Sequence, residues 1–301
     1  MIAVTGGTGF VGQRVLTLAT GPLCALTRKS RPAQPGIDWV AGDLGDAPAL
    51  SRLCAGAHTI VHVAGVVNAR DRTGFDAGNV AGTAAILAAA TAAGVRRFVH
   101  VSSVAAREPG LSMYGASKAA AETLVAASDV DWVTVRPPAV YGPGDRDMLA
   151  VYRLAAMGAA VAPGAGQMSL IHVDDLARAL LALALAGPSR ATLEIDDGHG
   201  EVGGYSHSDF ARAIGTAVGR MPFIAHLPVA ALRLGAEIAT LAARIGGGLP
   251  RLSRDRARYI AHPDWTARGG NAALADIWAP RFDLAAGLAD TVAGYRAKGW
   301  L

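Results

Sequence analysis

Tyr114 and Lys118 have the residue types and the spacing that most directly predict chemistry in this chain. They are four positions apart, so on a helix their side chains lie on the same face. A phenol with an ordinary pKa of about 10 is a weak acid near neutral pH. A nearby ammonium group stabilises the phenolate and lowers that pKa. The pair also occurs by chance on solvated helices, but beside a ligand site it predicts a tyrosine that exchanges protons at neutral pH.

Two adjacent serines precede this pair. Ser102 and Ser103 follow the apolar run Arg97–Val101, which reads as a strand. Neighbouring strand residues point to opposite faces, so we expect one of the two serines to reach the site. A hydroxyl at the carboxyl end of a parallel strand can stabilise a reacting oxygen as charge develops on it. A turn or capping role is the alternative for either serine.

A glycine-rich loop lies at the amino end of the chain, between a predicted strand at Ile2–Val4 and a predicted helix that reaches Ala19. Glycines at this spacing allow a tight turn and close approach of a pyrophosphate, and the helix amides then face the phosphates. A purely structural turn is the alternative. The candidate cofactor-binding residues of the loop are Gly6, Thr8, Gly9, Phe10, Val11 and Gly12.

The residues after the next strands predict which dinucleotide binds. Arg28 follows the predicted strand Leu23–Thr27 in a basic stretch without a carboxylate, which favours NADP(H) over NAD(H). A solvated basic loop is the alternative, and NAD(H) stays open. Asp43 could accept a hydrogen bond from the adenine amino group, with the Leu44 backbone nearby, although a turn or helix-capping aspartate is the alternative. Ala64 and Gly65, after the strand Thr59–Val63, leave room for the cofactor.

Short apolar strands alternate with Ala-rich helices through the first two-thirds of the chain. This alternation predicts an α/β fold with a doubly wound parallel Rossmann sheet and a smaller C-terminal lobe. We expect the dinucleotide-binding core at 1–145 with a returning segment at 171–196, and a substrate-binding lobe at 146–170 and 197–301. The other predicted strands are Trp39–Ala41, Asp131–Val135, Ile171–Val173 and Leu193–Ile195, and the predicted helices are 80–93, 113–128, 174–185 and 206–218. Breaks are expected at Gly246-Gly247-Gly248 and at Gly269-Gly270.

Composition excludes several classes of protein. The chain has 301 residues, 51% of them hydrophobic, and a mild net charge of +4 without a basic stripe, which argues against nucleic-acid binding. Cys24 and Cys54 lack metal-ligand spacing and are expected to be buried thiols in a reducing compartment. No signal peptide is evident, so a cytoplasmic location is expected. The apolar segment Val229–Ile245 contains three charged residues, which favours a packing helix over one lying on a membrane surface and argues against a spanning helix.

Together these motifs resemble the short-chain dehydrogenase/reductase superfamily, in particular its extended branch, which includes epimerases and dehydratases. The resemblance spans nearly the whole chain, and the motifs occur in the family's order. They are the glycine loop at 5–12, Gly42-Asp43-Leu44, 79–83, Val101-Ser102-Ser103, Tyr114–Lys118, 136–144 and 171–177.

The resemblance implies a role for each matching residue. Ser103 would polarise the substrate oxygen, Tyr114 would be the general acid or base, and Lys118 would bind the nicotinamide ribose and lower the tyrosine pKa. Asp43 and Leu44 would contact adenine, while Pro137 and the residues after it, including Val140, would border the nicotinamide. Asn79 would support the cofactor-side helix or a proton relay, with helix capping as the alternative. A further set would be structural and hold no metal: His172, Asp174 and Asp175.

Two departures from the family pattern bear on the substrate. Ser103 and Tyr114 are only 11 positions apart, so the intervening loop must be compact. Ala139 stands where sugar-nucleotide epimerases usually carry an asparagine that holds the substrate diphosphate. The chain therefore resembles the reductase members more closely, and we expect an NAD(P)-dependent carbonyl reductase or alcohol dehydrogenase acting on an apolar small molecule.

Two other functions stay open from the sequence: a sugar-nucleotide epimerase or dehydratase, and a non-catalytic NADP(H)-binding regulatory or assembly protein. Family members often dimerise through a four-helix bundle, and the Ala-rich stretches near 83–93 and 115–127 would suit such a homodimer.

Overall fold

A computed structural model describes residues 1–246 and 253–301. Contacts within the chain divide it into two compact units. The first unit comprises 1–137, 176–195 and 269–279, and the second comprises 138–175, 196–268 and 280–301. The predicted domain boundaries differ from these at 138–145, 171–175 and 196, which belong to the second unit, and at 269–279, which returns to the first. The substrate-binding role expected for the smaller lobe stays a prediction.

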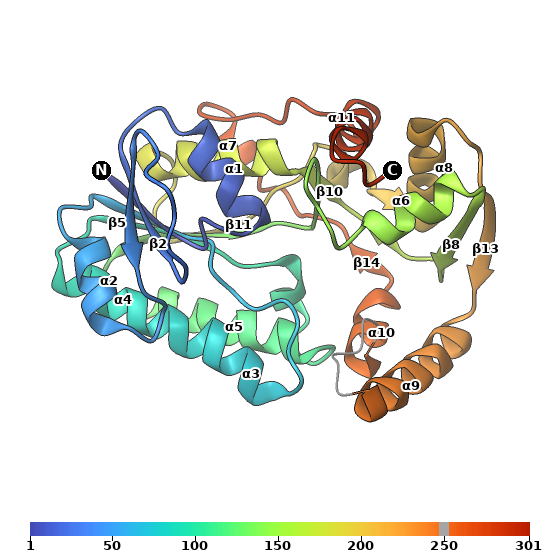
Figure 1. Cartoon of the computed structure of the whole chain (residues 1–301), viewed down its shortest axis with the longest axis horizontal. Helices are drawn as coiled ribbons and strands as arrows, with labels where there is room; N and C mark the ends of the chain where they lie inside the picture. The colour runs from blue at the N-terminus through green and yellow to red at the C-terminus, as the bar shows by residue number, and fades with distance from the viewer. Residues whose placement is uncertain (247–252) are drawn as a thin grey trace. The chain divides into compact units, whose positions relative to one another are not determined.

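The first unit is built on one seven-stranded parallel sheet (Figure 1). Its order is β11-β6-β5-β4-β1-β2-β3, so the chain moves outward from β1 in both directions, as in a doubly wound fold. The strands are β1 (Ile2–Thr5), β2 (Leu23–Thr27), β3 (Ile37–Ala41), β4 (Thr59–His62), β5 (Arg97–Val101), β6 (Asp131–Arg136) and β11 (Ala191–Glu194).

Helices cover both faces of this sheet, which explains why its central strands are mostly apolar. Figure 1 shows α1 (Phe10–Leu18) and α7 (Val173–Leu185) on one side, and α2 (Ala47–Cys54), α4 (Gly82–Ala92) and α5 (Met113–Ala126) on the other. Ile60 and Phe98 on the strands pack with Leu50 of α2 and Ile86 of α4 in a fully buried core. The short helices of this unit are α3 (Arg72–Asp76), η1 (Ala77–Ala81), η2 (Val104–Arg107) and η4 (Ala272–Leu274).

The second unit combines small sheets with helices. Its strands are β7 (Ala139–Tyr141), β8 (Ala159–Pro163), β9 (Gln167–Met168), β10 (Leu170–His172), β12 (Tyr205–Ser206), β13 (Phe223–Leu227) and β14 (Asp264–Trp265). Its helices are α6 (Leu149–Ala156), η3 (Gly200–Val202), α8 (His207–Val218), α9 (Val229–Gly246), α10 (Arg254–Ile260) and α11 (Leu284–Ala297). Tyr141, Tyr152, Phe210, Leu288 and Tyr295 form its main core.

Two further expectations can be compared with this fold. Cys24 and Cys54 are buried free thiols, as predicted, and burial raises the pKa of each to about 11. The predicted break at Gly246-Gly247-Gly248 lies outside the described residues from Gly247 onward. Within the described parts of the chain, no helix combines the length and the apolar character needed to cross a bilayer.

A buried ion-pair network joins four elements of the first unit. Arg136, at the end of β6, binds Glu122 of α5 through Nε at 2.8 Å and Nη2 at 2.6 Å. Glu194, at the end of β11, binds Arg107 of η2 at 2.9 Å and Arg136 at 3.4 Å. Paired and largely shielded from water, these charges hold η2 and α5 against the strand ends.

Candidate active site

The glycine loop leaves the end of β1 and turns directly into α1. Gly6 has a φ of +75°, and a side chain at Gly12 would clash with the Gly6 carbonyl oxygen. The Gly9 amide donates to the Gly6 carbonyl at 2.9 Å, which closes the turn. Gly9 is the N-cap of α1 and supplies no side chain to cap its first amides. The loop therefore presents a bare helix N-terminus, which suits a dinucleotide pyrophosphate.

Tyr114 and Ser103 meet in the structure. The two hydroxyl groups are close enough for Ser103 to lower the pKa of the phenol. Ser103 lies at the carboxyl end of β5 and caps η2, accepting from the Ala105 amide at 3.2 Å. Tyr114 lies in the first turn of α5, which Ser112 caps by accepting from the Gly115 amide at 2.9 Å. Two capped helix starts thus fix the hydroxyl pair.

The adjacent serines take different directions. Ser102 donates to Glu122 Oε1 at 2.5 Å and so joins the ion-pair network, whereas Ser103 influences the pKa of Tyr114. The expectation that only one serine reaches the site follows from the alternation along the strand.

The segment between Ser103 and Tyr114 has few residues, and the 3-10 helix η2 folds part of it compactly. The Ala106 amide donates to the Ser103 carbonyl at 3.0 Å, and the Glu108 amide to the Ala105 carbonyl at 3.2 Å. A further bond runs from the Leu111 amide to the Glu108 carbonyl at 3.1 Å. These successive turns bring α5 back to the end of β5, so the 11-residue spacing is compatible with the hydroxyl pair.

Lys118 lies one turn after Tyr114 and is buried. Its Nζ donates to the Val101 carbonyl at 2.7 Å, and a side chain at Gly65 would come within 3.5 Å of it. An ammonium has three donors, so two remain for other partners. Burial lowers the pKa of Lys118 to about 8, and the nearby Glu122 carboxylate opposes that shift. A lysine whose pKa lies near 8 is partly deprotonated close to neutral pH, as is common at sites of proton transfer.

The depressed pKa of Lys118 predicts a pH-dependent stability. In the unfolded chain the group keeps its proton up to about pH 10.5, whereas in the folded chain it releases it near pH 8. Burial of the ammonium therefore lowers the free energy of unfolding by its full amount below pH 8. This penalty decreases as the pH rises from 8 to 10.5, because the buried amine is then neutral, and it is absent above that range. The unfolding free energy of the wild type should gain about 3 kcal/mol relative to Lys118→Met across that window.

Urea unfolding at several pH values from 7 to 10.5 measures this gain, with Lys29→Met at an exposed position as the matched control. A constant difference between the wild type and Lys118→Met at every pH would show that burial does not depress this pKa.

The pKa of Tyr114 moves in the direction opposite to the sequence expectation. Burial raises it, and the hydrogen bond with Ser103 lowers it by less. The ammonium of Lys118 is bound to the Val101 carbonyl instead, so burial outweighs charge at the phenol. The raised pKa thus keeps the Tyr114 hydroxyl protonated at neutral pH.

Asn79 connects two segments beside the candidate site. It lies in η1, a π-helical turn of the kind often found at functional sites. Its Oδ1 accepts from the Val66 amide at 2.6 Å, and its Nδ2 donates to the Val66 carbonyl and to Ser117 Oγ, both at 2.9 Å. Ser117 in turn donates to the Tyr114 carbonyl at 2.8 Å. Asn79 therefore links the segment after β4 to α5, rather than capping a helix.

The residues expected around adenine lie after β2 and β3. Arg28 is exposed directly after β2. Asp43 is exposed after β3, and its Oδ1 accepts from the Gly45 amide at 2.8 Å, which leaves the other oxygen available. The half-buried Leu44 packs against the core below α4. The Ala64 amide, after β4, donates weakly to Thr5 Oγ1 at 3.4 Å.

Of the remaining candidates, Pro137 belongs to the first unit, and Val140 and Asp175 belong to the second. Pro137 follows β6, and its carbonyl accepts from the Val104 amide at 3.1 Å, which ties η2 to the strand end. Val140 lies on β7 in the second unit, paired in register with Ile171. Asp175, in that unit, accepts from the amides of Arg281 and Phe282 at 3.0 Å each, as expected of a structural carboxylate.

Sequence reasoning missed several residues that support the site. Glu122 both binds Ser102 and raises the pKa of Lys118, and its position one turn after Lys118 was the available signal. His62 and His100 stack face to face beneath the site with ring centroids 5.5 Å apart. Burial, followed by the charge of Lys118, lowers the pKa of both histidines, to about 3 for His62. Two neutral rings therefore line the interior side of the lysine.

Comparisons with known proteins identify the family of this chain. A family model described as the NAD dependent epimerase/dehydratase family matches residues 2–195. A ceramide reductase of Caulobacter vibrioides is 36% identical over 311 residues, which cover 100% of this chain and 96% of that protein. A 2-alkyl-3-oxoalkanoate reductase of Stenotrophomonas maltophilia is 32% identical over 225 residues, or 63% of this chain and 67% of that protein.

Solved structures show a similar fold. The Bordetella bronchiseptica enzyme WbmH in complex with NAD+ superposes with a TM-score of 0.75 at 17% identity, over 99% of this chain and 98% of that one. At this identity the likeness concerns the fold alone. The fold, the glycine loop and the bare N-terminus of α1 fit a nicotinamide dinucleotide, while no comparison separates NADP from NAD.

Proposed function

Because this chain belongs to the NAD dependent epimerase/dehydratase family, we propose that it is an NADP(H)-dependent ketone reductase with Ser103, Tyr114 and Lys118 as catalytic residues. The family and its named reductases make it an NAD(P)-dependent oxidoreductase. The observation that carries the finer proposal is the proximity of the Ser103 and Tyr114 hydroxyl groups, with the buried Lys118 one helical turn away. A purely structural site has no need of a buried ammonium beside this pair.

Each of the three residues has its own role in the proposed reaction. A bound reduced nicotinamide supplies the hydride that the carbonyl carbon receives. Tyr114 donates its hydroxyl proton to the carbonyl oxygen, and its raised pKa keeps that proton in place until the oxygen becomes basic. Ser103 holds the oxygen by a hydrogen bond that strengthens as negative charge develops. Lys118, with two unused donors, binds the ribose and offsets the charge left on the phenolate.

The substrate that we propose is a ketone on a long apolar chain. Support comes from the names of the relatives, a ceramide reductase and a 2-alkyl-3-oxoalkanoate reductase, since both act on lipid-like molecules. Ala139 also lacks the amide that holds a substrate diphosphate in the sugar-nucleotide epimerases that the chain resembles. The homodimer through α4 and α5 stays a prediction, which sedimentation equilibrium would test.

Absorbance of reduced nicotinamide during turnover tests the proposal. With a long-chain 3-oxo amide or a 2-alkyl-3-oxo acid as substrate, NADPH should be consumed in an amount equal to the alcohol formed. Conversion of UDP-glucose without net change in cofactor would assign an epimerase instead. Tight NADPH binding without turnover of any of these compounds would favour the non-catalytic binding protein.

The cofactor preference depends on Arg28. Its exposed guanidinium after β2 suits the 2′-phosphate of NADPH, and an aspartate there would repel that phosphate. Arg28→Asp should weaken NADPH binding by about 10- to 100-fold relative to NADH, which corresponds to roughly 1.4–2.7 kcal/mol.

Fluorescence titration of both cofactors measures this ratio. Arg96→Asp provides the matched control, because Arg96 is exposed before the opposite, amino end of β5. An unchanged NADPH-to-NADH ratio in Arg28→Asp would contradict the assignment.

A further inference from the structure

Helices α9 and α10 of the second unit pack against each other through a small apolar contact. Leu232 and Ala236 of α9 and Ala257 of α10 are buried together, with Ile260 and Ala261 packed at the edge. This contact confirms that Val229–Ile245 contains a packing helix. It occupies only one side of α9.

The other side of α9 is also apolar, but it is exposed. Leu234 and Ile238 are each 62% exposed, and Leu241 is 61% exposed. At about 100° per residue, these three side chains lie nearly opposite Leu232 and Ala236. A helix that is apolar on two opposite faces normally has both of them covered. An exposed stripe of this kind marks an interaction surface.

Positive charge is concentrated in the same helix pair. Helices α9 and α10 contain five arginines against two carboxylates, Glu237 and Asp255. Their net formal charge is therefore +3, compared with +4 for all 301 residues.

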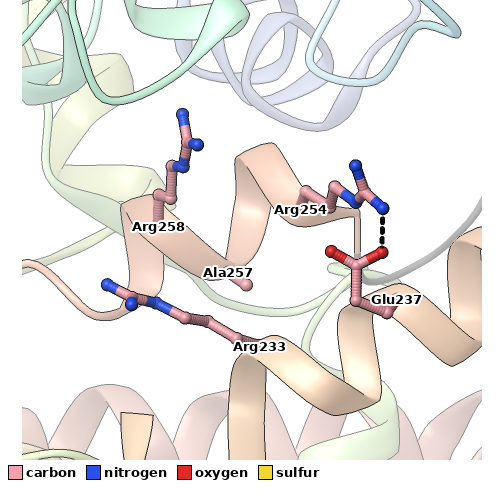
Figure 2. A pocket seen from close by; sticks show the side chains of 5 residues that line it. All are labelled: Arg233, Glu237, Arg254, Ala257 and Arg258. Atoms are coloured by element: carbon pink, nitrogen blue, oxygen red, sulfur yellow. Dashed lines mark ion pairs between the residues drawn. The ribbon is translucent and has the colours of Figure 1, made fainter. Parts of the chain in front are cut away.

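A small open hollow lies between the two helices, lined by Arg233, Glu237, Arg254, Ala257 and Arg258. Figure 2 shows the three guanidinium groups around Ala257, with Arg254 directed at Glu237, to which it is ion-paired. Arg233, Arg254 and Arg258 are exposed. Guanidinium groups bind phosphate oxygens in bidentate geometry.

We propose that α9 and α10 form a docking surface for an anionic lipid bilayer. Leu234, Ile238 and Leu241 enter the boundary between headgroups and acyl chains, and the arginines bind the lipid phosphates. The concentration of charge decides between the candidate occupants. A second copy of this chain would place two strongly basic surfaces against each other, which is unfavourable, whereas an anionic membrane complements both the charge and the apolar stripe.

Vesicle flotation tests this docking surface directly. The whole protein is mixed with phosphatidylcholine vesicles that either contain or lack phosphatidylglycerol. The wild type should bind the anionic vesicles at least about tenfold more tightly, and added salt should weaken that binding. Leu234→Ser/Ile238→Ser/Leu241→Ser should lower the binding at least about tenfold, as should Arg233→Gln/Arg258→Gln.

Matched controls separate the surface from general effects. Leu185→Ser changes a leucine of α7 that is 80% exposed, and Arg52→Gln/Arg96→Gln removes the same charge from exposed positions of the first unit. Both should bind as the wild type does. All variants should retain NADPH affinity and melting temperature, because the changed side chains are exposed and lie outside the proposed catalytic and cofactor residues.

A second measurement depends on a gain of signal. Ile238→Cys can be labelled with an environment-sensitive dye, since Cys24 and Cys54 are buried. The emission should shift to the blue with anionic vesicles, and the same dye on Leu185→Cys should not respond.

Three results would overturn the proposal. These are a wild type that stays in solution with anionic vesicles, equal binding by the surface variants and their controls, and a wild-type dimer that the triple serine variant dissociates. The last result would assign the stripe to a second copy of the chain.

Discussion

Tyr114→Phe is expected to lower kcat by about 10²- to 10⁴-fold, the usual contribution of a positioned general acid. NADPH affinity should stay nearly unchanged, because the substitution removes one oxygen and keeps the ring, whose centroid lies 6.2 Å from that of Phe75. The loss should fall on kcat rather than on KM, since the proton moves only in the transition state. Steady-state kinetics with a long-chain ketone, together with a cofactor titration, measures both quantities.

Tyr295→Phe is the matched control. The Tyr295 hydroxyl is buried without a hydrogen-bond partner among the described residues, so its removal should leave kcat unchanged. If Tyr114→Phe kept the wild-type kcat, the proton donor would have to be another group. If both variants lost activity equally, the effect would report on packing rather than on proton transfer.

Substitutions of the two adjacent serines should have very different effects on kcat. Ser103→Ala should lower kcat by about 10²- to 10³-fold, since it removes a donor aimed at the developing oxyanion. Ser102→Ala should leave kcat close to the wild-type value. Its cost should appear in stability instead, at about 1 kcal/mol, because Glu122 loses one hydrogen-bond donor.

Kinetics and urea unfolding of both variants separate these roles. Activity loss in Ser102→Ala with full activity in Ser103→Ala would reverse the assignment. Equal activity loss in both would indicate that the end of β5, rather than one hydroxyl group, is what the reaction needs.

The sheet and the glycine loop were predictable because local patterns dictate them. Leu23–Thr27 and Arg97–Val101 were predicted with the boundaries that the structure shows, since short, mostly apolar segments that alternate with helices indicate strands of a parallel sheet. The turn at Gly6 and the close approach at Gly12 also followed from residue type alone.

The interior of the site was less predictable, because it depends on contacts between distant residues. Which serine faces Tyr114 depends on Glu122, twenty positions away, which binds Ser102. The direction of the Tyr114 pKa depends on burial, which no local pattern reports. The stacked pair of His62 and His100 arises from the register between β4 and β5.

The second unit was predicted least well. Strands as short as Gln167–Met168 or Tyr205–Ser206 carry too few residues to show an alternating pattern. The basic surface of α9 and α10 was missed for a related reason. Its arginines are separated in the sequence, and only the packing of Leu232 and Ala236 against α10 shows which face of α9 stays exposed.

Transfer of a labelled hydride tests the central claim most directly. NADPH that carries deuterium at the transferring C4 position is incubated with the wild type and a long-chain 3-oxo amide, and the product is analysed by mass spectrometry. We predict one deuterium on the carbinol carbon of each alcohol formed, and formation of this labelled alcohol about 10²- to 10⁴-fold more slowly with Tyr114→Phe. Product without deuterium, or label that stays in the cofactor while the substrate changes, would contradict a reductase.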